Sequence, residues 1–203
     1  MTAEGYTSRN RVKLVSGGKE YFTLLHELVN KAIHTVYLQY YIYEDDETGQ
    51  SLKKTLIQAA DRGVAVYLQV DGYASQKLPK QFVAELRKAG VQFKWFEQLF
   101  KSRKFYFGRR LHHKVVVVDG IYSMVGGINI SNRYNDMPGA DAWMDMALYC
   151  EGEASLEVHA LCRSMWGKTG PDRLDPAGAE EYFRQVDEKD FHDARIRRND
   201  WVK

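Results

Sequence analysis

The chain has 203 residues, with 29 lysines and arginines against 27 aspartates and glutamates and a formal net charge of +2. This length fits one domain with a real hydrophobic core, and the near-neutral balance gives no overall case for nucleic-acid binding. No apolar run approaches the roughly 20 residues that span a bilayer, and the polar opening segment lacks the features of a signal peptide. Cys150 and Cys162 are too few for a disulfide framework, so we expect reduced thiols and a cytoplasmic location.

Strands and helices are predicted to alternate through the first half of the chain. Apolar spacing and β-branched runs predict strands at residues 12–15, 35–43, 64–70 and 91–96, and helices at 19–33, 51–62 and 78–89. This alternation is typical of an α/β sandwich with a largely parallel sheet. Ligands bind at the carboxyl ends of strands in such sheets, and residues 71–75 follow one of these ends.

A hairpin is predicted next, at residues 115–125. Asp119-Gly120 is typical of a two-residue turn in which both residues have positive φ. Such a turn would set a register in which Val116 faces Ser123. Since hairpin strands are antiparallel, the predicted fold class is α/β, a three-layer α/β/α sandwich with a mixed, largely parallel sheet.

The rest of the chain carries a basic segment and a second run of elements. Residues 101–110 place five basic residues around three aromatic ones, which suits anionic lipid headgroups, nucleic-acid phosphates or simply a solvated loop. A strand is predicted at residues 143–149 with Asp145 at its centre, followed by helices at 154–166 and 179–186.

Polar side chains are predicted to gather where the hairpin opens. His112 and Lys114 are two residues apart, so they point to the same face of a strand. Gly126 and Gly127 lie beside them, where the missing Cβ lets a ligand or another backbone come close. Asn129 follows just past the strand end. An imidazole, an ammonium group and a carboxamide over glycine backbone suit an anion site.

Each of these residues has an ordinary structural interpretation when it is taken alone. A single histidine on a strand is most often structural, and a lysine beside it is usually solvated. The long pattern H-x-K-x4-D-x6-G-G-x-N favours function for His112, Lys114 and Asn129. Asp119 is an odd number of residues from His112 and occupies the turn, so we expect it to hold the hairpin and not to touch a substrate.

The predicted site suits phosphodiester exchange. His112 would attack phosphorus or protonate the leaving oxygen, while Lys114 and Asn129 hold the non-bridging oxygens. Asp145 is the candidate carboxylate that orients the imidazole. The sequence contains no Walker-type loop, no carboxylate cluster and no Cys/His ligand set, so we expect neither a metal nor another cofactor.

These residues resemble the HKD motif of the phospholipase D superfamily. The likeness is strongest to the first half of bacterial cardiolipin synthases and extends to residues 20–22, 40–44, 71–73 and 195–200. It implies two pseudo-symmetric halves that share one site, and transfer of a phosphatidyl group through a phosphohistidine. The motif implies His112, Lys114 and Asp119 as catalytic residues, and phosphate contacts from Lys114, Gly127, Asn129 and Ser131.

The chain departs from this family pattern because it holds one H-x-K motif where the reaction needs two. None of the other histidines that we considered is followed two residues later by lysine; these are His26, His34, His159 and His192. We therefore expect residues 1–203 to be a single domain that is either the N-terminal half of a longer protein or a homodimer subunit. Its implied substrate is phosphatidylglycerol, met by peripheral contact at the inner face of the cell membrane.

Two alternatives remain open at this point. Single-motif members of the superfamily act as homodimeric, metal-independent nucleases, so nucleic acid would be the partner in that case. The other alternative is an inactive module that binds phosphate or a lipid headgroup.

Overall fold

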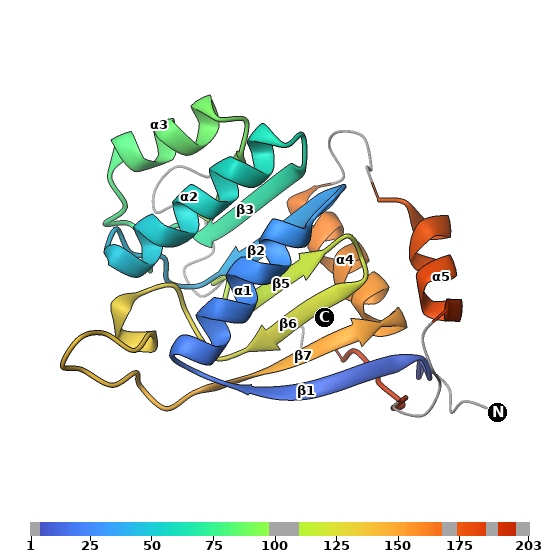
Figure 1. The fold of residues 1–203 in the computed structure, drawn as a ribbon. Coiled ribbons are helices and arrows are strands. Elements are labelled where there is room, and N and C mark those ends of the chain that lie inside the picture. The colour runs from blue at the N-terminus through green and yellow to red at the C-terminus, as the bar shows by residue number, and fades with distance from the viewer. Residues whose placement is uncertain (1–4, 98–109, 168–173, 186–190, 198–203) are drawn as a thin grey trace.

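The computed structural model describes residues 5–97, 110–167, 174–185 and 191–197 (Figure 1). Its elements in chain order are β1 (Asn10–Ser16), α1 (Lys19–Lys31), β2 (Thr35–Tyr40), α2 (Glu47–Asp61), β3 (Ala65–Asp71), α3 (Lys80–Lys88), β4 (Gln92–Phe96), β5 (Lys114–Val118), β6 (Tyr122–Gly126), the 3-10 helix η1 (Asn132–Tyr134), β7 (Met146–Gly152), α4 (Glu153–Trp166) and α5 (Pro176–Gln185). In the part of the chain that is described, every helix is too short or too polar to cross a bilayer.

The strands form one seven-stranded sheet in the order β1-β7-β6-β5-β2-β3-β4. The predicted mixed α/β sheet is confirmed, but the expectation of largely parallel pairing is wrong. Among the strand pairs of the described residues, only β2–β3 and β3–β4 are parallel, whereas the other four pairs are antiparallel. Two of these antiparallel pairs, β5–β6 and β6–β7, join strands that follow one another without a crossover α-helix, and parallel neighbours require such crossovers.

Helices cover both faces of the sheet, which gives three layers (Figure 1). α1, α2 and α3 pack on one face, and α4 packs on the other against β2, β5, β6 and β7. β5 is buried on both sides because its valines alternate between two cores. Val116 and Val118 join the larger core under α1 to α3, whereas Val117 joins Val158 and Cys162 under α4.

The β5–β6 hairpin has a register one residue away from the prediction. Val116 pairs with Met124, and Val117 pairs with Ser123, so the connection has three residues instead of two. Both predicted turn residues do have positive φ, 52° at Asp119 and 66° at Gly120. At the start of this connection, the backbone N–H of Asp119 donates to Thr35 O at 2.9 Å, which extends the pairing of β5 with β2 by one residue.

The start of β7 also differs from the prediction. β7 begins at Met146, so Asp145 comes just before the strand and not at its centre. This matters for the site because a residue outside the sheet ladder can turn its side chain toward the β6 end.

Candidate functional site

His112 and Lys114 meet at the start of β5. Lys114 Nζ lies 3.4 Å from His112 Nε2 and donates to the carbonyl oxygen of His112 at 3.0 Å. His113 points to the other face, where its Nδ1 lies 2.9 Å from Gln39 Oε1 on β2. The predicted alternation of these side chains is therefore confirmed. Lys114 is nearly buried, with 6% of its surface exposed, so its ammonium group is held in a fixed place.

Tyr41 is a third member of this cluster that sequence reasoning did not single out. The residue follows β2, whose last residue, Tyr40, pairs with Lys114. The Tyr41 ring centroid lies 5.0 Å from the His112 ring centroid and 5.2 Å from Lys114 Nζ. The second distance is that of a cation–π contact, so one aromatic ring supports both the imidazole and the ammonium group. The aromatic residues at this strand end were the available signal.

The charges around the pair favour a neutral imidazole. Partial loss of solvent and the neighbouring Lys114 charge both lower the pKa of His112, while the Asp71 carboxylate opposes them by raising it. Burial lowers the pKa of Lys114, and the Asp145 carboxylate raises it. A neutral imidazole beside a cation is the state that a nitrogen nucleophile requires.

The Asp145 carboxylate lies against Gly127, just past the end of β6. A Cβ on Gly127 would overlap the Asp145 carboxylate, whose Oδ1 also accepts the N–H of Met146 at 2.7 Å. Among the described residues no hydrogen bond joins Asp145 to His112, so its predicted role in orienting the imidazole stays a prediction. The contact of Gly127 with phosphate likewise stays a prediction, and the structure gives this glycine a further reason to lack a side chain.

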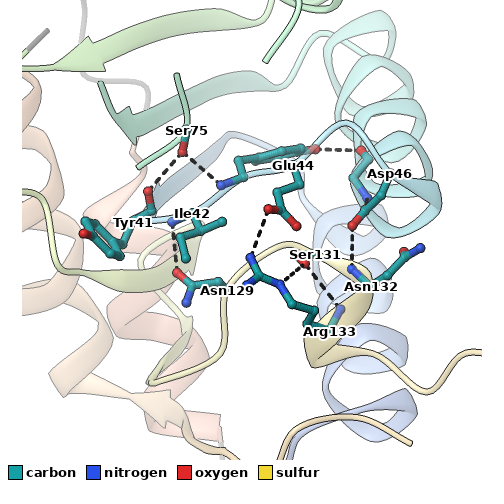
Figure 2. A network of polar contacts seen from close by, with 11 residues as sticks. Tyr41, Ile42, Glu44, Asp46, Ser75, Asn129, Ser131, Asn132 and Arg133 are labelled. Carbon is teal, nitrogen blue, oxygen red and sulfur yellow. Dashed lines mark hydrogen bonds and ion pairs between the residues drawn. The ribbon is translucent and has the colours of Figure 1, made fainter. Parts of the chain in front are cut away.

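Asn129 is buried beside the end of β2, with an exposed fraction of 2%. Its Oδ1 accepts the backbone N–H of Ile42 at 3.0 Å, which turns the amide toward the segment that carries Tyr41 (Figure 2). Because the oxygen is used in this way, the Nδ2 group is the part of Asn129 that could donate to a phosphoryl oxygen.

Ser131 is fully buried at the N-terminus of η1. Its hydroxyl accepts the backbone N–H of Arg133 at 3.3 Å, and the Arg133 guanidinium reaches Glu44 at 2.9 Å (Figure 2). This is a helix-capping contact that fixes the loop. The predicted phosphate contact of Ser131 stays a prediction.

Asp119 lies at the opposite end of β5 from His112. Its carboxylate accepts three backbone N–H groups, from Ile33 at 2.8 Å, His34 at 2.9 Å and Thr35 at 2.7 Å. The catalytic role implied by the motif is therefore corrected for this residue, because a strand separates it from the imidazole. The carboxylate instead anchors the hairpin to the start of β2, as its position in the turn predicted.

The predicted basic segment at residues 101–110 lies outside the described residues except for Arg110, whose guanidinium lies over the Tyr73 ring at 5.1 Å. The described residues contain no group of three His, Cys, Asp or Glu side chains that could hold a metal ion. The polar groups that the described residues bring to the site are the His112 imidazole, the Lys114 ammonium group and the Asn129 amide.

Comparisons with known proteins identify a family for this chain. The family described as cardiolipin synthase, PLD-like domain, matches residues 25–165. A cardiolipin synthase of Halalkalibacterium halodurans is 35% identical over 170 residues, which cover 81% of this chain and 33% of the relative. The chain spans about a third of the length of the curated relatives that it matches.

Solved structures share the fold at low sequence identity. The phospholipase D family member Nuc from Salmonella typhimurium superposes with a TM-score of 0.54 at 16% identity, over 92% of this chain and 99% of that one. A phosphatidylserine synthase from Haemophilus influenzae gives a TM-score of 0.60 at 12% identity, over 92% of this chain and 47% of that one. The second coverage means that a chain of this size corresponds to about half of that enzyme.

Proposed function

Because the chain belongs to the phospholipase D-like domain family of cardiolipin synthases, we propose that it is one half of a phosphatidyltransferase that works through a phosphohistidine. The observation that carries the proposal is the 3.4 Å contact between His112 Nε2 and Lys114 Nζ beside the Tyr41 ring. Its substrate is an anionic phospholipid such as phosphatidylglycerol, which the domain meets at the inner face of the cell membrane.

The proposed reaction has two steps that each exchange one bond at phosphorus. In the first, the lone pair of His112 Nε2 attacks, the bond to the departing alcohol breaks, and a second histidine gives that oxygen its proton. In the second, an acceptor alcohol or water attacks the phosphohistidine, loses its proton to the second histidine and releases His112. The lowered pKa of His112 supports the role of nucleophile because it keeps the lone pair available near neutral pH.

Lys114 and Asn129 have the proposed task of holding the non-bridging oxygens. Nζ already contacts Nε2, so it can reach an oxygen of a phosphoryl group attached there. The Asp145 charge raises the pKa of Lys114 and so favours the ammonium form that this task needs. In this proposal Asp145 acts on the lysine, in addition to its predicted action on the imidazole.

The second histidine is proposed to come from another phospholipase D-like half. The chain corresponds to about a third of its cardiolipin synthase relatives and about half of the phosphatidylserine synthase. These shares support a second half within one longer protein, with a homodimer as the other possibility.

The proposal is tested with two variants of the longer protein that contains both halves, one at His112 and the other at the adjacent His113. In vesicles containing phosphatidylglycerol, His112→Ala should lower phosphatidyl transfer roughly 10³-fold or more. His113→Ala is the matched control, since His113 lies on the other face of the sheet. A phosphoryl group trapped on His112 and detected by mass spectrometry would support the covalent step, whereas undiminished transfer by His112→Ala would contradict the proposal.

A metal-independent nuclease remains the alternative within the superfamily, and a binding module that turns nothing over remains the alternative outside it. The likeness to Nuc at 16% identity concerns the fold, so it does not favour nucleic acid. Cleavage of single-stranded DNA in the presence of a chelator, with binding that weakens steeply with salt, would favour the nuclease. Phosphate binding without turnover of either substrate would favour the module.

A further inference from the structure

Asp71 is a buried carboxylate at the end of β3 that the mechanism above does not use. Its side chain has no exposed surface. Oδ1 accepts the backbone N–H groups of Tyr73 and Ala74, both at 2.9 Å, and Oδ2 accepts that of Leu111 at 2.9 Å. Three N–H donors are enough to stabilise a buried negative charge without a basic partner.

The bond to Leu111 is the unusual one, because it joins residues that are 40 positions apart and reaches the backbone directly before His112. Leu111 is itself buried, with an exposed fraction of 1%. The carboxylate therefore holds the chain at the point where it enters β5. We propose that Asp71 is a positioning residue of this site, which sets the place of His112 through the backbone of Leu111.

The loop that follows Asp71 also holds the segment beside the site. Ser75 Oγ donates to the carbonyl oxygen of Tyr41 at 3.0 Å and accepts the N–H of Tyr43 at 3.0 Å (Figure 2). Residues 71–75 thus tie together the strand end that carries the Tyr41 ring and the backbone that carries His112. One short loop at the carboxyl end of β3 therefore holds both the Tyr41 segment and the backbone that leads to His112.

Asp71 acts on His112 through its charge as well as through its hydrogen bonds. The charged groups that act on the imidazole are Lys114, which lowers its pKa, and Asp71, which raises it. The Tyr41 ring packs against the same imidazole without adding a charge. A carboxylate that stabilised a loop far from the imidazole would not change how His112 titrates, so titration tests whether the Asp71 charge reaches this ring. The split between kcat and KM tests whether Asp71 sets the place of the ring.

The test compares Asp71→Asn with Asp119→Asn in the full chain by NMR titration of the histidine side chains. Asp119 is a matched control because it is also a buried carboxylate with three backbone N–H donors, but it lies at the other end of β5. Asp71→Asn should move the titration of His112 to lower pH, and Asp119→Asn should leave it in place. An unmoved His112 in Asp71→Asn, or equal shifts in both variants, would overturn the proposal.

Hydrogen exchange in the unmodified chain gives a second measurement, which serves even where Asp71→Asn fails to fold. The Leu111 amide should exchange slowly because it is buried and bonded to Asp71. Exchange as fast as that of an open loop would overturn the proposal.

The catalytic readout rests on the function proposed above, whereas the titration and the exchange do not. In the longer protein that contains both halves, Asp71→Asn should lower the kcat of phosphatidyl transfer roughly 10- to 100-fold with little change in KM. The reason is that the His112 nucleophile is misplaced while the substrate still binds. An unchanged kcat would count against positioning. If the unmodified protein transfers no phosphatidyl group, the function proposal fails and the two NMR measurements still decide the role of Asp71.

Discussion

At the scale of single residues, the His112 imidazole lies between charges of opposite sign. Lys114 contacts the imidazole and lowers its pKa. Asp71, which is bonded to the backbone N–H of Leu111, raises the pKa of His112. Because the neutral imidazole is the nucleophile in the proposed reaction, activity should fall as pH decreases through the pKa of His112. The two neighbouring charges should therefore move this limb of the pH profile in opposite directions when they are removed.

Replacing Lys114 by glutamine tests the positive neighbour. Lys114→Gln removes a charge that disfavours the imidazolium form, so the pKa of His112 should rise and its NMR titration should move to higher pH. Phosphatidyl transfer should also drop roughly 10²- to 10³-fold, since a donor to the phosphoryl oxygens is lost. Lys94→Gln is a suitable control, because Lys94 donates to the carbonyl oxygen of Trp166 on α4. A His112 titration that stays in place in Lys114→Gln would contradict this account.

The pairing of His112 with Lys114 could be predicted from the sequence because it depends only on the two-residue period of a strand. The contacts made by Tyr41 and Asp71 could not, since they depend on how β2 and β3 are ordered beside β5. Asp71 and Leu111 are 40 residues apart, and no local pattern joins them. Motif reasoning likewise grouped Asp119 with His112, although a whole strand lies between them.

At the scale of elements, the two glycines at the end of β6, Gly126 and Gly127, each lie against a different neighbour. A Cβ on Gly126 would lie 2.6 Å from the Ala147 Cα on β7, whereas a Cβ on Gly127 would overlap the Asp145 carboxylate. The first neighbour is backbone and cannot yield, but the second is the end of a side chain and can. The close approach predicted for these glycines is therefore confirmed for another backbone at Gly126.

This difference predicts distinct phenotypes for two alanine substitutions. Gly126→Ala should destabilise the fold by about 1–3 kcal/mol, because β6 and β7 must move apart. Gly127→Ala should change the free energy of unfolding by less than about 1 kcal/mol but lower transfer roughly tenfold, because the displaced Asp145 no longer supports Lys114. Denaturant unfolding and the vesicle assay measure the two effects. Similar losses of stability in both variants would refute the distinction.

The observed start of α2 differs from the predicted one because a side-chain contact, which residue propensities do not reveal, caps the helix. Residues 44–49 are acidic and contain a glycine, so they read as a loop, yet α2 begins at Glu47. The Asp46 side chain accepts the N–H of Gly49 at 2.9 Å, which caps the helix earlier. Gly49 is needed there because a Cβ would overlap the carbonyl oxygen of Glu44.

At the scale of the whole molecule, the described chain supplies one histidine to the site and keeps others occupied elsewhere. His26 Nδ1 on α1 lies 2.7 Å from Thr55 Oγ1 on α2. His159 lies on the buried face of α4, and its ring centroid is 5.0 Å from that of Tyr37 on β2. Neither is in a position to protonate an oxygen leaving from a phosphoryl group on His112. Under the proposed function, the acid is therefore expected from a second domain.

The need for a second half predicts how transfer activity depends on protein concentration and on whether the second half is present. If the second half belongs to the same longer protein, residues 1–203 alone should transfer phosphatidyl groups roughly 10²- to 10⁴-fold more slowly than the two-motif protein, which is the contribution expected of a positioned general acid. The specific activity of the short chain should stay at that low level across a dilution series, and adding a separately produced second half should raise it. His112→Ala of the short chain is the control, since it should not support such a rise. A specific activity that increases with the concentration of the short chain alone would instead assign the acid to a second copy, because only self-association then completes the site.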